Sequence, residues 1–318
     1  MKSIYLSDDK ISLKNVYSDY ISEDTLYSKE DIISNPMLFS QTEFIFSTWG
    51  MPYFDKKEIE NYFPNLKAIF YSAGSVQSFA RPFLESGVRV FSAYAANAVP
   101  VAEFALSEII LANKGFFKAI KKKSTREDVL GYKGNFNATL GIVGAGMIGS
   151  LLIEKLRDFD FKIFVYDPFL SDSRAQSLGV QKVSLEELFK SCQVISNHLA
   201  DNEETKGIFT KSLFELMLPY ATFINTGRGR QVIESDLIEV LRKRQDLTAI
   251  LDVTYPEPPI DDSPLYTLDN CIITPHIAGS MGDEVKRMAK FMNDEYLHYI
   301  NGEECKCEIT SDMLKTMA

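Results

Sequence analysis

Short runs of apolar residues alternate with longer amphipathic stretches over much of the chain. In the N-terminal third the runs cover residues 3–6, 43–49, 67–73 and 88–93. The stretches between them are polar or have one apolar face, as in "DKKEIENYF". Because strands that alternate with helices form parallel sheets, we expect this third to build a parallel sheet with helices on its faces.

A second and stronger series of apolar runs begins at residue 139. It covers residues 139–144, 162–167, 193–199, 221–226, 248–253 and 271–275. Most of these runs contain few polar residues, which is typical of strands that are covered on both faces. Six such strands with helices between them predict a doubly wound α/β domain.

Two longer segments predict long helices. Residues 97–123 are expected to form one helix at a domain junction, with Pro100 in its first turn, where the missing N–H costs little. Residues 282–302 predict the second helix, and no strand is expected after Pro275.

Length, charge and cysteine content limit the class of protein. A chain of 318 residues favours two domains, and a net charge of −10 argues against a nucleic-acid binder, which needs a basic face. The dense basic cluster at residues 118–126 is interpreted as the solvated end of a helix. No signal peptide is recognised, and no run approaches the ~20 apolar residues of a membrane span. The four cysteines do not suit a disulfide framework or a zinc cluster, so we expect a cytoplasmic protein without a metal site.

The first candidate binding motif is the G-x-G-x-x-G spacing within "TLGIVGAGMIGSLL". It follows an apolar strand and opens a helix, where backbone N–H groups and the helix dipole can bind a pyrophosphate. Gly144 is expected to form the tight turn, Gly146 to let the backbone approach phosphate, and Gly149 to let helix and strand pack closely. Met147 and Ile148, in the first turn of the helix, are expected to belong to the same site.

A carboxylate follows at the end of the next expected strand, as a dinucleotide site requires. Asp167 lies 18 residues after Gly149, and its oxygens suit the ribose hydroxyls of NAD and repel the 2′-phosphate of NADP. Arg174 follows shortly and could meet a phosphate, so NAD is preferred and NADP stays open.

Nicotinamide chemistry also needs a group that gives or takes a proton near neutral pH. His276 is preferred over His198, which also ends an apolar run, and over His298, which lies in the expected C-terminal helix. Arg228 and Glu257 also follow apolar runs, and in a doubly wound sheet those strand ends face one crevice. Arg228 can bind a carboxylate through two hydrogen bonds, while Glu257 can orient His276 and favour its imidazolium form. Together they predict a site that binds a small carboxylate and protonates a neighbouring oxygen.

Several segments resemble those of the D-isomer-specific 2-hydroxyacid dehydrogenases. They are "NAVPVAEFALSEIILA", "LGIVGAGMIG", "VYDP", "NHLADNEETKGIF", "FINTGRGRQVIE", "LDVTYPEPP" and "ITPHIAG". They extend from about residue 97 to residue 279, whereas the preceding part matches loosely, best at "FYSAGSVQSF".

The resemblance implies a fold of two doubly wound α/β domains. A Rossmann NAD-binding domain of residues 97–282 would be inserted in a flavodoxin-like substrate domain, split between residues 1–96 and 283–318. It also implies a homodimer that uses NAD and interconverts a small 2-keto acid and its D-2-hydroxy acid, with neither nucleic acid nor membrane as a partner.

The same resemblance implies roles for individual residues. Arg228 would bind the substrate carboxylate, and His276, tuned by Glu257, would be the acid/base. Asp252 would contact the nicotinamide carboxamide. The other expected contacts are Thr226 and Gly227 with the cofactor, and the backbone N–H groups of Gly74, Ser75 and Val76 with the substrate carboxylate.

Two features leave the function partly open. Ala200 and Asp201 depart from the family pattern, and Asp201 would repel an anionic substrate if it faced the site. Because corepressors that sense NAD(H) resemble the same family, an NAD(H)-sensing binding protein without significant turnover is the alternative. Among substrates, we expect a modest, unphosphorylated keto acid.

Overall fold

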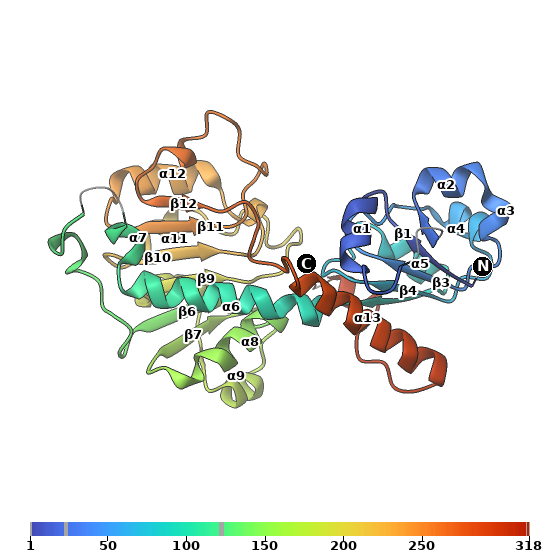
Figure 1. Cartoon of the computed structure of the whole chain (residues 1–318). Coiled ribbons are helices and arrows are strands. Elements are labelled where there is room, and N and C mark those ends of the chain that lie inside the picture. Colours follow the sequence, from blue (N-terminus) through green and yellow to red (C-terminus); the bar gives the residue numbers. More distant parts are fainter. Residues whose placement is uncertain (1, 22–24, 121–123, 316, 318) are drawn as a thin grey trace. The chain divides into compact units, whose positions relative to one another are not determined.

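The computed structural model describes residues 2–21, 25–120, 124–315 and 317. The chain forms two compact units, Met1–Ala98 with Ser280–Ala318, and Val99–Gly279. The junctions therefore lie at 98/99 and 279/280, where the sequence placed them at 96/97 and 282/283. Each unit is built on its own largely parallel sheet (Figure 1), so the expected α/β class with two doubly wound sheets is confirmed.

The first unit contains a six-stranded sheet with the order β13-β5-β4-β3-β1-β2. Its strands are β1 (Ser3–Leu6), β2 (Leu26–Tyr27), β3 (Phe44–Ser47), β4 (Ala68–Tyr71), β5 (Arg89–Ser92) and β13 (Glu308–Ile309). All neighbouring pairs are parallel except β13 and β5. The order 2-1-3-4-5 of the parallel strands is that of flavodoxin-like sheets.

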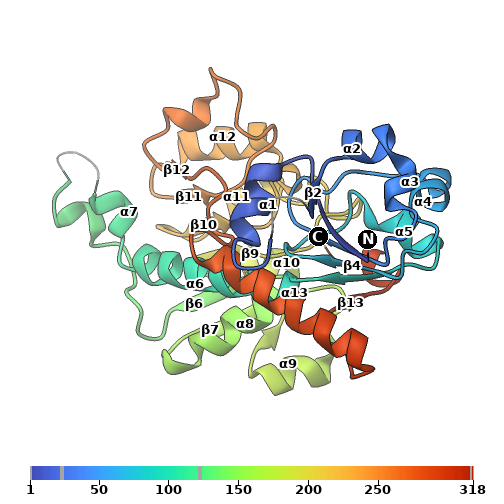
Figure 2. The ribbon, with the colours of Figure 1, turned by 45° about the vertical axis from the view of Figure 1, so that its right-hand side comes forward.

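Helices cover both faces of this sheet (Figure 2). They are α1 (Lys10–Val16), α2 (Lys29–Ser34), α3 (Pro36–Phe39), α4 (Lys56–Tyr62), α5 (Ala80–Glu85) and α13 (Glu284–Asn301). On one face, Val16 of α1 and Met288 of α13 pack with the buried rings of Phe46 and Phe70. On the other face, α2 to α5 enclose a core that includes Phe54 and Phe83.

The second unit contains a seven-stranded parallel sheet with the order β12-β11-β10-β9-β6-β7-β8. Its strands are β6 (Thr139–Val143), β7 (Lys162–Tyr166), β8 (Gln181–Lys182), β9 (Val194–Asn197), β10 (Thr222–Asn225), β11 (Thr248–Leu251) and β12 (Cys271–Ile273). Counted within the unit, this order reads 7-6-5-4-1-2-3, the dinucleotide-binding order extended by one strand. The six expected strands are present, and the short β8 was not predicted.

The helices of this unit alternate with its strands. They are α6 (Tyr94–Asn113), which begins in the first unit and continues in the second, α7 (Phe116–Ala119), α8 (Met147–Lys155), α9 (Asp172–Leu178), α10 (Leu185–Ser191), α11 (Lys211–Leu216) and α12 (Glu234–Lys243). Short 3₁₀ turns cover Glu127–Val129, Leu156–Asp158, Gly229–Gln231 and Pro264–Tyr266, and a further one in the first unit covers Met313–Lys315. Two separate cores fill the two faces of the sheet, one including Phe189 and Phe223, the other Ile142 and Ile250.

The single long helix expected over residues 97–123 is not observed. α6 ends at Asn113, and Gly115 adopts a left-handed φ of 67° before the short α7. The last part of that segment, residues 121–123, lies outside the described residues, so the basic cluster at 118–126 is described only in part. Pro100 lies inside α6 and not in its first turn, because the helix begins six residues earlier, at Tyr94, among alanines that favour helix.

The expectation of no strand after Pro275 is wrong. β13 pairs antiparallel with β5, and the buried carboxylate of Glu295 holds the chain that leads to it. Glu295 Oε2 accepts hydrogen bonds from the backbone N–H groups of Lys306, at 2.9 Å, and Cys307, at 3.2 Å. A strand of two residues is too short to show a periodic pattern in the sequence, so β13 can be recognised only from its pairing with β5.

α6 is long and apolar enough to cross a membrane by length and composition alone, with a mean hydropathy of 1.4. Half of it is buried inside the protein, where Ala102, Ala105 and Ile109 pack against the second sheet. We therefore interpret α6 as a core helix.

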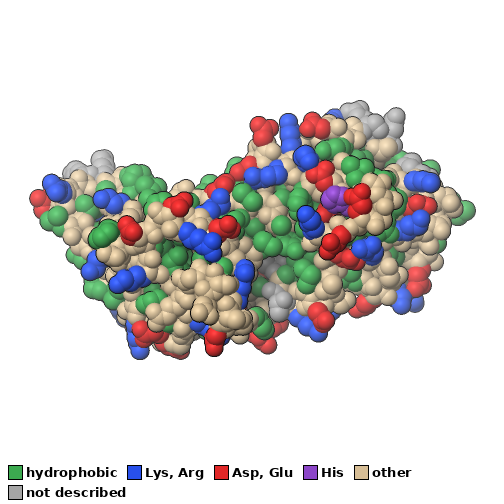
Figure 3. Space-filling model, turned by 90° about the horizontal axis from the view of Figure 1, so that it is seen from below, with side chains coloured by type: hydrophobic (Ala, Val, Ile, Leu, Met, Phe, Trp, Pro, Cys, Tyr) green, Lys and Arg blue, Asp and Glu red, His purple; other side chains and the backbone are tan. Residues whose placement is uncertain are grey.

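Acidic and basic side chains are interspersed over the face shown in Figure 3.

Candidate active site

The glycine loop joins β6 to α8, and its three glycines meet different constraints. Gly144 has a φ of 93°, and a Cβ there would lie 2.7 Å from the backbone oxygen of His198. A Cβ on Gly149 would lie 2.0 Å from the backbone oxygen of Gly144. By contrast, a Cβ on Gly146 would meet no atom within 4 Å. The fold therefore requires Gly144 and Gly149, whereas at Gly146 it leaves open space.

The start of α8 has the donors that a pyrophosphate needs. Gly146 is the N-cap residue and no side chain caps the helix, so the N–H groups of its first turn, which includes Met147 and Ile148, are not used by a cap. Asp167 closes the other side of the loop. Its Oδ2 accepts from the N–H of Ala145 at 2.7 Å, and its Oδ1 accepts from Phe169 at 2.8 Å. Open space at Gly146, uncapped donors and a carboxylate at the end of β7 fit a dinucleotide.

Arg228 follows the end of β10, and its loop is held by a buried polar network. Its backbone N–H donates to Oε1 of Gln231 at 3.1 Å, and its Nη1 donates to the carbonyl of Gly227 at 2.7 Å. The amide of Asn197 donates to the same Gln231 oxygen at 2.7 Å. A Cβ on Gly229 would lie 2.0 Å from the backbone of Thr254, so this close packing requires glycine.

The guanidinium of Arg228 is half-buried, and within the described part of the chain no carboxylate forms an ion pair with it. Arg230, two residues on, is different, because Asp201 and Glu203 pair with it at 2.6 and 3.0 Å. Arg230 thus neutralises Asp201, so the charge of Asp201 is not expected to repel an anionic substrate. Apart from the Nη1 bond to Gly227, the guanidinium of Arg228 keeps its donors for a ligand.

Gln231 and Asn197 were missed by sequence reasoning. Both side chains are fully buried, and they link the ends of β9 and β10 beneath the Arg228 loop. A glutamine after "GRGR" gives no signal of its own, because only the burial of its amide shows that it has a positioning role.

His276 follows β12 and forms a pair with Glu257. Its Nδ1 lies 2.6 Å from Oε1 of Glu257, and the two side chains are 47% and 41% exposed, so both can reach a ligand. Because an ionised carboxylate can only accept, Nδ1 carries the proton and Nε2 is left for a substrate. His276 also adopts a positive φ of 54°, which is uncommon for a non-glycine residue and points to a constrained loop.

Asp252 holds the loop that carries His276. Only 2% of it is exposed, and its carboxylate accepts from the N–H groups of Ile277 at 2.8 Å and Ala278 at 2.9 Å. The hydroxyl of Thr274 donates to it as well, at 2.6 Å. The observed role of Asp252 is therefore to fix the backbone around His276. Since β10, β11 and β12 are neighbours, the loops of Arg228, Asp252 and His276 leave the same edge of the sheet.

His198 is placed differently from His276. It is buried between two hydroxyls, with Nε2 at 2.9 Å from Ser196 Oγ and Nδ1 at 3.1 Å from Thr226 Oγ1. Desolvation lowers the pKa of His198 to about 4, so the ring is neutral at neutral pH. Thr226, expected near the cofactor, is therefore also a partner of His198.

In the first unit, Gly74, Ser75 and Val76 follow β4. The hydroxyl of Ser92 donates to the carbonyl of Gly74 at 2.7 Å, and Val76 is buried in the core. Among the described residues, none accepts a hydrogen bond from the backbone N–H groups of these three positions. In the same described part of the chain, no group of three or more His, Cys, Asp or Glu side chains could hold a metal ion.

These features define a class of protein, the nucleotide-dependent oxidoreductases. The class has a doubly wound sheet with a glycine loop, a carboxylate after the second strand, and an Arg, Glu and His set after later strands. The comparisons name the family. Residues 112–278 match the model of the D-isomer specific 2-hydroxyacid dehydrogenase, NAD binding domain. The chain belongs to the D-isomer specific 2-hydroxyacid dehydrogenase family.

Relatives agree with this assignment, and solved structures share the fold. A D-3-phosphoglycerate dehydrogenase of Archaeoglobus fulgidus is 30% identical over 222 residues, which cover 69% of this chain and 42% of that protein. The D-mandelate dehydrogenase of Rhodotorula graminis has the same fold, with a TM-score of 0.80, 17% identity and 98% of each chain covered. A D-2-hydroxyisocaproate dehydrogenase gives a TM-score of 0.76 at 22% identity, covering 98% of this chain and all of that one. The chain thus spans less than half the length of the phosphoglycerate dehydrogenase it matches.

Proposed function

We propose that this protein is an NAD-dependent oxidoreductase that interconverts a small 2-keto acid and its D-2-hydroxy acid. The observation that carries the proposal is the 2.6 Å pair of His276 and Glu257 on the same sheet edge as an Arg228 that no described carboxylate neutralises. Because a keto acid presents a carboxylate next to a carbonyl, it matches one cation beside one proton donor.

His276 is proposed as the acid/base. In the reducing direction its Nε2 gives a proton to the carbonyl oxygen, and in the reverse direction it takes the proton back. The Glu257 carboxylate stabilises the charged ring and keeps the proton on Nδ1. Asp252 holds the backbone of residues 277 and 278, so it acts on the reaction through the placement of His276. Arg228 is proposed to bind the substrate carboxylate. The backbone N–H groups of Gly74, Ser75 and Val76, which make no hydrogen bond to a described residue, are proposed to bind the same carboxylate.

NAD is proposed as the cofactor, held by Gly144 to Gly149 and Asp167, with Thr226, Gly227 and Asp252 as further contacts. When bound, its nicotinamide supplies or accepts the hydride. Asp167 supports NAD over NADP, because a carboxylate at the end of β7 would repel a 2′-phosphate. Arg174 in α9 is exposed. A homodimer and a cytoplasmic location are part of the same proposal.

The test is a spectrophotometric assay of NADH and NADPH oxidation with glyoxylate, pyruvate, hydroxypyruvate and bulkier keto acids. We expect turnover with NADH, and a loss of kcat of about 100-fold or more in His276→Ala, because general acid catalysis is removed. His298→Ala is the matched control, since His298 lies on α13, where its ring nitrogens are 3.9 Å from Glu295 and 3.8 Å from Glu303.

The proposal fails if the wild type reduces no keto acid, or if His276→Ala keeps full activity. Tight NADH binding without turnover of any substrate in the panel would favour the NAD(H)-sensing alternative.

A further inference from the structure

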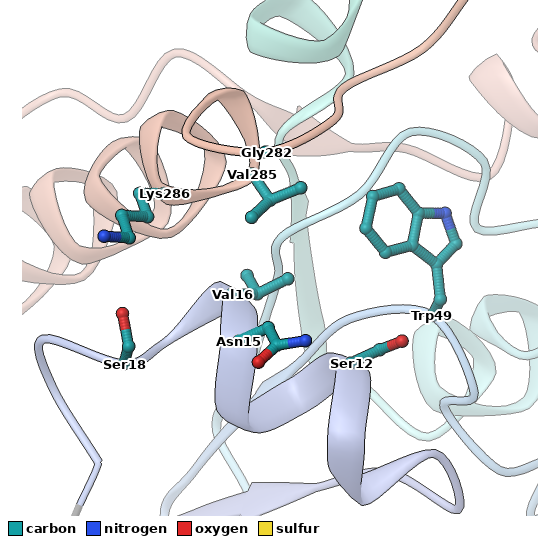
Figure 4. A pocket seen from close by; sticks show the side chains of 8 residues that line it. All are labelled: Ser12, Asn15, Val16, Ser18, Trp49, Gly282, Val285 and Lys286. Atoms are coloured by element: carbon teal, nitrogen blue, oxygen red, sulfur yellow. The ribbon is translucent and has the colours of Figure 1, made fainter. Parts of the chain in front are cut away.

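Helix α13 lines a pocket at each of its two ends. Near its start, Val285 and Trp49 line one pocket (Figure 4). Near its end, Tyr296, Tyr299 and Ile300 line a second pocket of about 570 Å³. The size of this second pocket is typical of small-molecule sites, which measure roughly 300–1,000 Å³. The residues of the candidate active site do not line it.

The wall of the second pocket across from α13 is the edge of the sheet where the strands begin. Lys2 precedes β1, Lys67 precedes β4, and Arg89 is the first residue of β5. The backbone N–H of Phe44, at the start of β3, donates to the carbonyl of Lys2 at 3.0 Å. The backbone N–H of Arg89 donates to the carbonyl of Lys67, also at 3.0 Å. Because these strands are parallel and begin side by side, three cationic side chains meet in one pocket.

Carboxylates neutralise these cations only in part. Lys67 pairs with Glu43 at 3.3 Å, while Lys2 forms no ion pair with any residue that the structure describes. Glu308 accepts from Nε and Nη2 of Arg89 at 2.7 and 2.6 Å, so Nη1 is left for a ligand. Three cations against two carboxylates leave an excess of positive charge, in a chain whose net charge is −10.

The α13 wall of the second pocket is aromatic. The rings of Tyr296 and Tyr299 pack edge-to-face against Phe44, with ring centroids 5.2 and 5.8 Å apart. The guanidinium of Arg89 lies over the ring of Tyr299, 4.9 Å from its centroid, so a cation and an aromatic surface are held together. Both tyrosines are partly exposed and Ile300 is 47% exposed, which leaves apolar surface for a ligand.

This combination fits a small molecule with a flat apolar body and a single negative charge. A carboxylate can accept hydrogen bonds from Nζ of Lys2 and Nη1 of Arg89. A phosphate carries more negative charge, and Glu43, Glu308 and the negative end of the α13 dipole would repel it more strongly. The lining therefore favours an aromatic monocarboxylate over a phosphorylated ligand.

The second pocket lies at the edge of the sheet opposite to the proposed carboxylate-binding loop. Lys67 precedes β4, whereas Gly74 follows it. The four residues of β4 between them span about 13 Å. A ligand in the second pocket therefore does not occupy the place of the substrate in this unit.

We propose that the second pocket binds a small aromatic monocarboxylate, at a site separate from that of the proposed reaction. The ring of the ligand lies against Tyr296 and Tyr299, and its carboxylate lies between Lys2 and Arg89. The inference does not depend on the proposed function, because it uses none of the residues assigned to the reaction.

Isothermal titration calorimetry of the full chain with 3-phenylpropanoate tests this binding. We expect a Kd below about 1 mM, at least about tenfold lower than for acetate, which lacks the ring, and for 3-phenylpropan-1-ol, which lacks the charge. Phenyl phosphate should bind no more tightly than 3-phenylpropanoate.

Two pairs of variants locate the bound ligand. Lys2→Glu reverses the unpaired charge and should weaken binding by about tenfold, whereas Lys57→Glu, an exposed change on α4 outside the pocket, should not. Ile300→Glu adds a carboxylate to the apolar wall and should weaken binding by about tenfold as well. Leu297→Glu is its matched control, because Leu297 is 43% exposed on the same helix and does not line the pocket.

Arg228→Gln distinguishes the second pocket from the candidate active site, since Arg228 is the other cation proposed to bind a carboxylate. This variant should leave the binding in place. Four results would overturn the proposal: no binding of 3-phenylpropanoate, tighter binding of phenyl phosphate, equal weakening by a variant and its control, or binding that Arg228→Gln abolishes and Lys2→Glu retains.

Discussion

At the scale of single residues, the candidate site combines exposed reactive groups with buried groups that hold them. His276 and Glu257 are roughly half exposed, whereas Asp252 and Gln231 are almost fully buried. Gln231 accepts a hydrogen bond from the backbone N–H of Arg228, and Asp252 accepts one from the backbone N–H of Ile277, so each holds the backbone of a loop of the candidate site. Such an arrangement keeps the reactive side chains accessible while their backbones stay in place.

Glu108 on α6 is a buried carboxyl that the proposed reaction does not use. It is 6% exposed, and its Oε2 has no hydrogen-bond partner among the described residues. Desolvation, with a smaller contribution from the charge of Asp252, raises the pKa of Glu108 to about 8. The folded protein therefore keeps this carboxyl protonated at neutral pH.

We predict that Glu108 makes stability depend on pH. Because the folded state holds the proton up to about pH 8 and the unfolded state loses it near the ordinary pKa of 4.5, stability falls as pH rises through this window. Glu108→Gln keeps a neutral side chain, so its free energy of unfolding at pH 8 should exceed that of the wild type by on the order of 1–3 kcal/mol. Urea unfolding at pH 5, 6.5 and 8 measures this.

Glu103→Gln, an exposed change on the same helix, should leave the pH dependence unaltered. Parallel pH curves for Glu108→Gln and the wild type would show that the Glu108 carboxyl is charged in the folded protein.

At the scale of elements, two glycines of the loop before α8 are expected to serve different purposes: Gly149 is needed for folding, and Gly146 for binding of the cofactor. Gly149→Ala places a Cβ against the backbone oxygen of Gly144 and should destabilise the protein by about 1–3 kcal/mol or more. Gly146→Val meets no neighbouring atom, so it should fold normally and lower NADH affinity by about 100-fold or more, because the side chain occupies the phosphate space. Thermal unfolding and NADH fluorescence titration of both variants distinguish the effects.

The opposite pattern would refute this division. If Gly146→Val lowered the melting temperature as much as Gly149→Ala, or if it bound NADH as the wild type does, the open space at Gly146 would not be a phosphate site.

Most elements could be predicted because their pattern is local. The runs at residues 3–6 and 139–144 became β1 and β6, since an apolar strand covered on both faces shows in its own residues. β2, β8 and β13 have two residues each, too few to show any period. The start of α6 was missed because Pro100 suggested the beginning of a helix, whereas the helix begins at Tyr94 and includes this proline.

At the scale of the whole molecule, exposed apolar side chains gather in one stretch of the second unit. Phe116, Ile120, Leu130 and Phe136 lie between residues 116 and 136 and are 40%, 58%, 67% and 75% exposed. Exposed apolar groups of this size can contribute to an interaction surface. This stretch supports the proposed homodimer.

We predict that Leu130→Asp combined with Phe136→Asp converts a dimer into a monomer, because each change places a charge where apolar contact is expected. Light scattering after gel filtration should give the mass of one chain for the double variant and of two for the wild type. Met37→Asp, a change at an 84% exposed position in α3, is the control and should stay dimeric. A wild type that elutes as a single chain at micromolar concentration would contradict the dimer.

The sequence by itself determined the fold class, the glycine loop, Asp167 as a candidate cofactor ligand and the Arg228, Glu257 and His276 set. These depend on local spacing and on the rule that parallel strands end at one edge. The tertiary structure alone decided that Asp252 and Gln231 hold the loops of the candidate site, that Asp201 is neutralised by Arg230, and that Val16, Trp49 and Val285 line one pocket. The physical reason is that each of these joins residues far apart in the chain, so no local pattern records which of them come into contact.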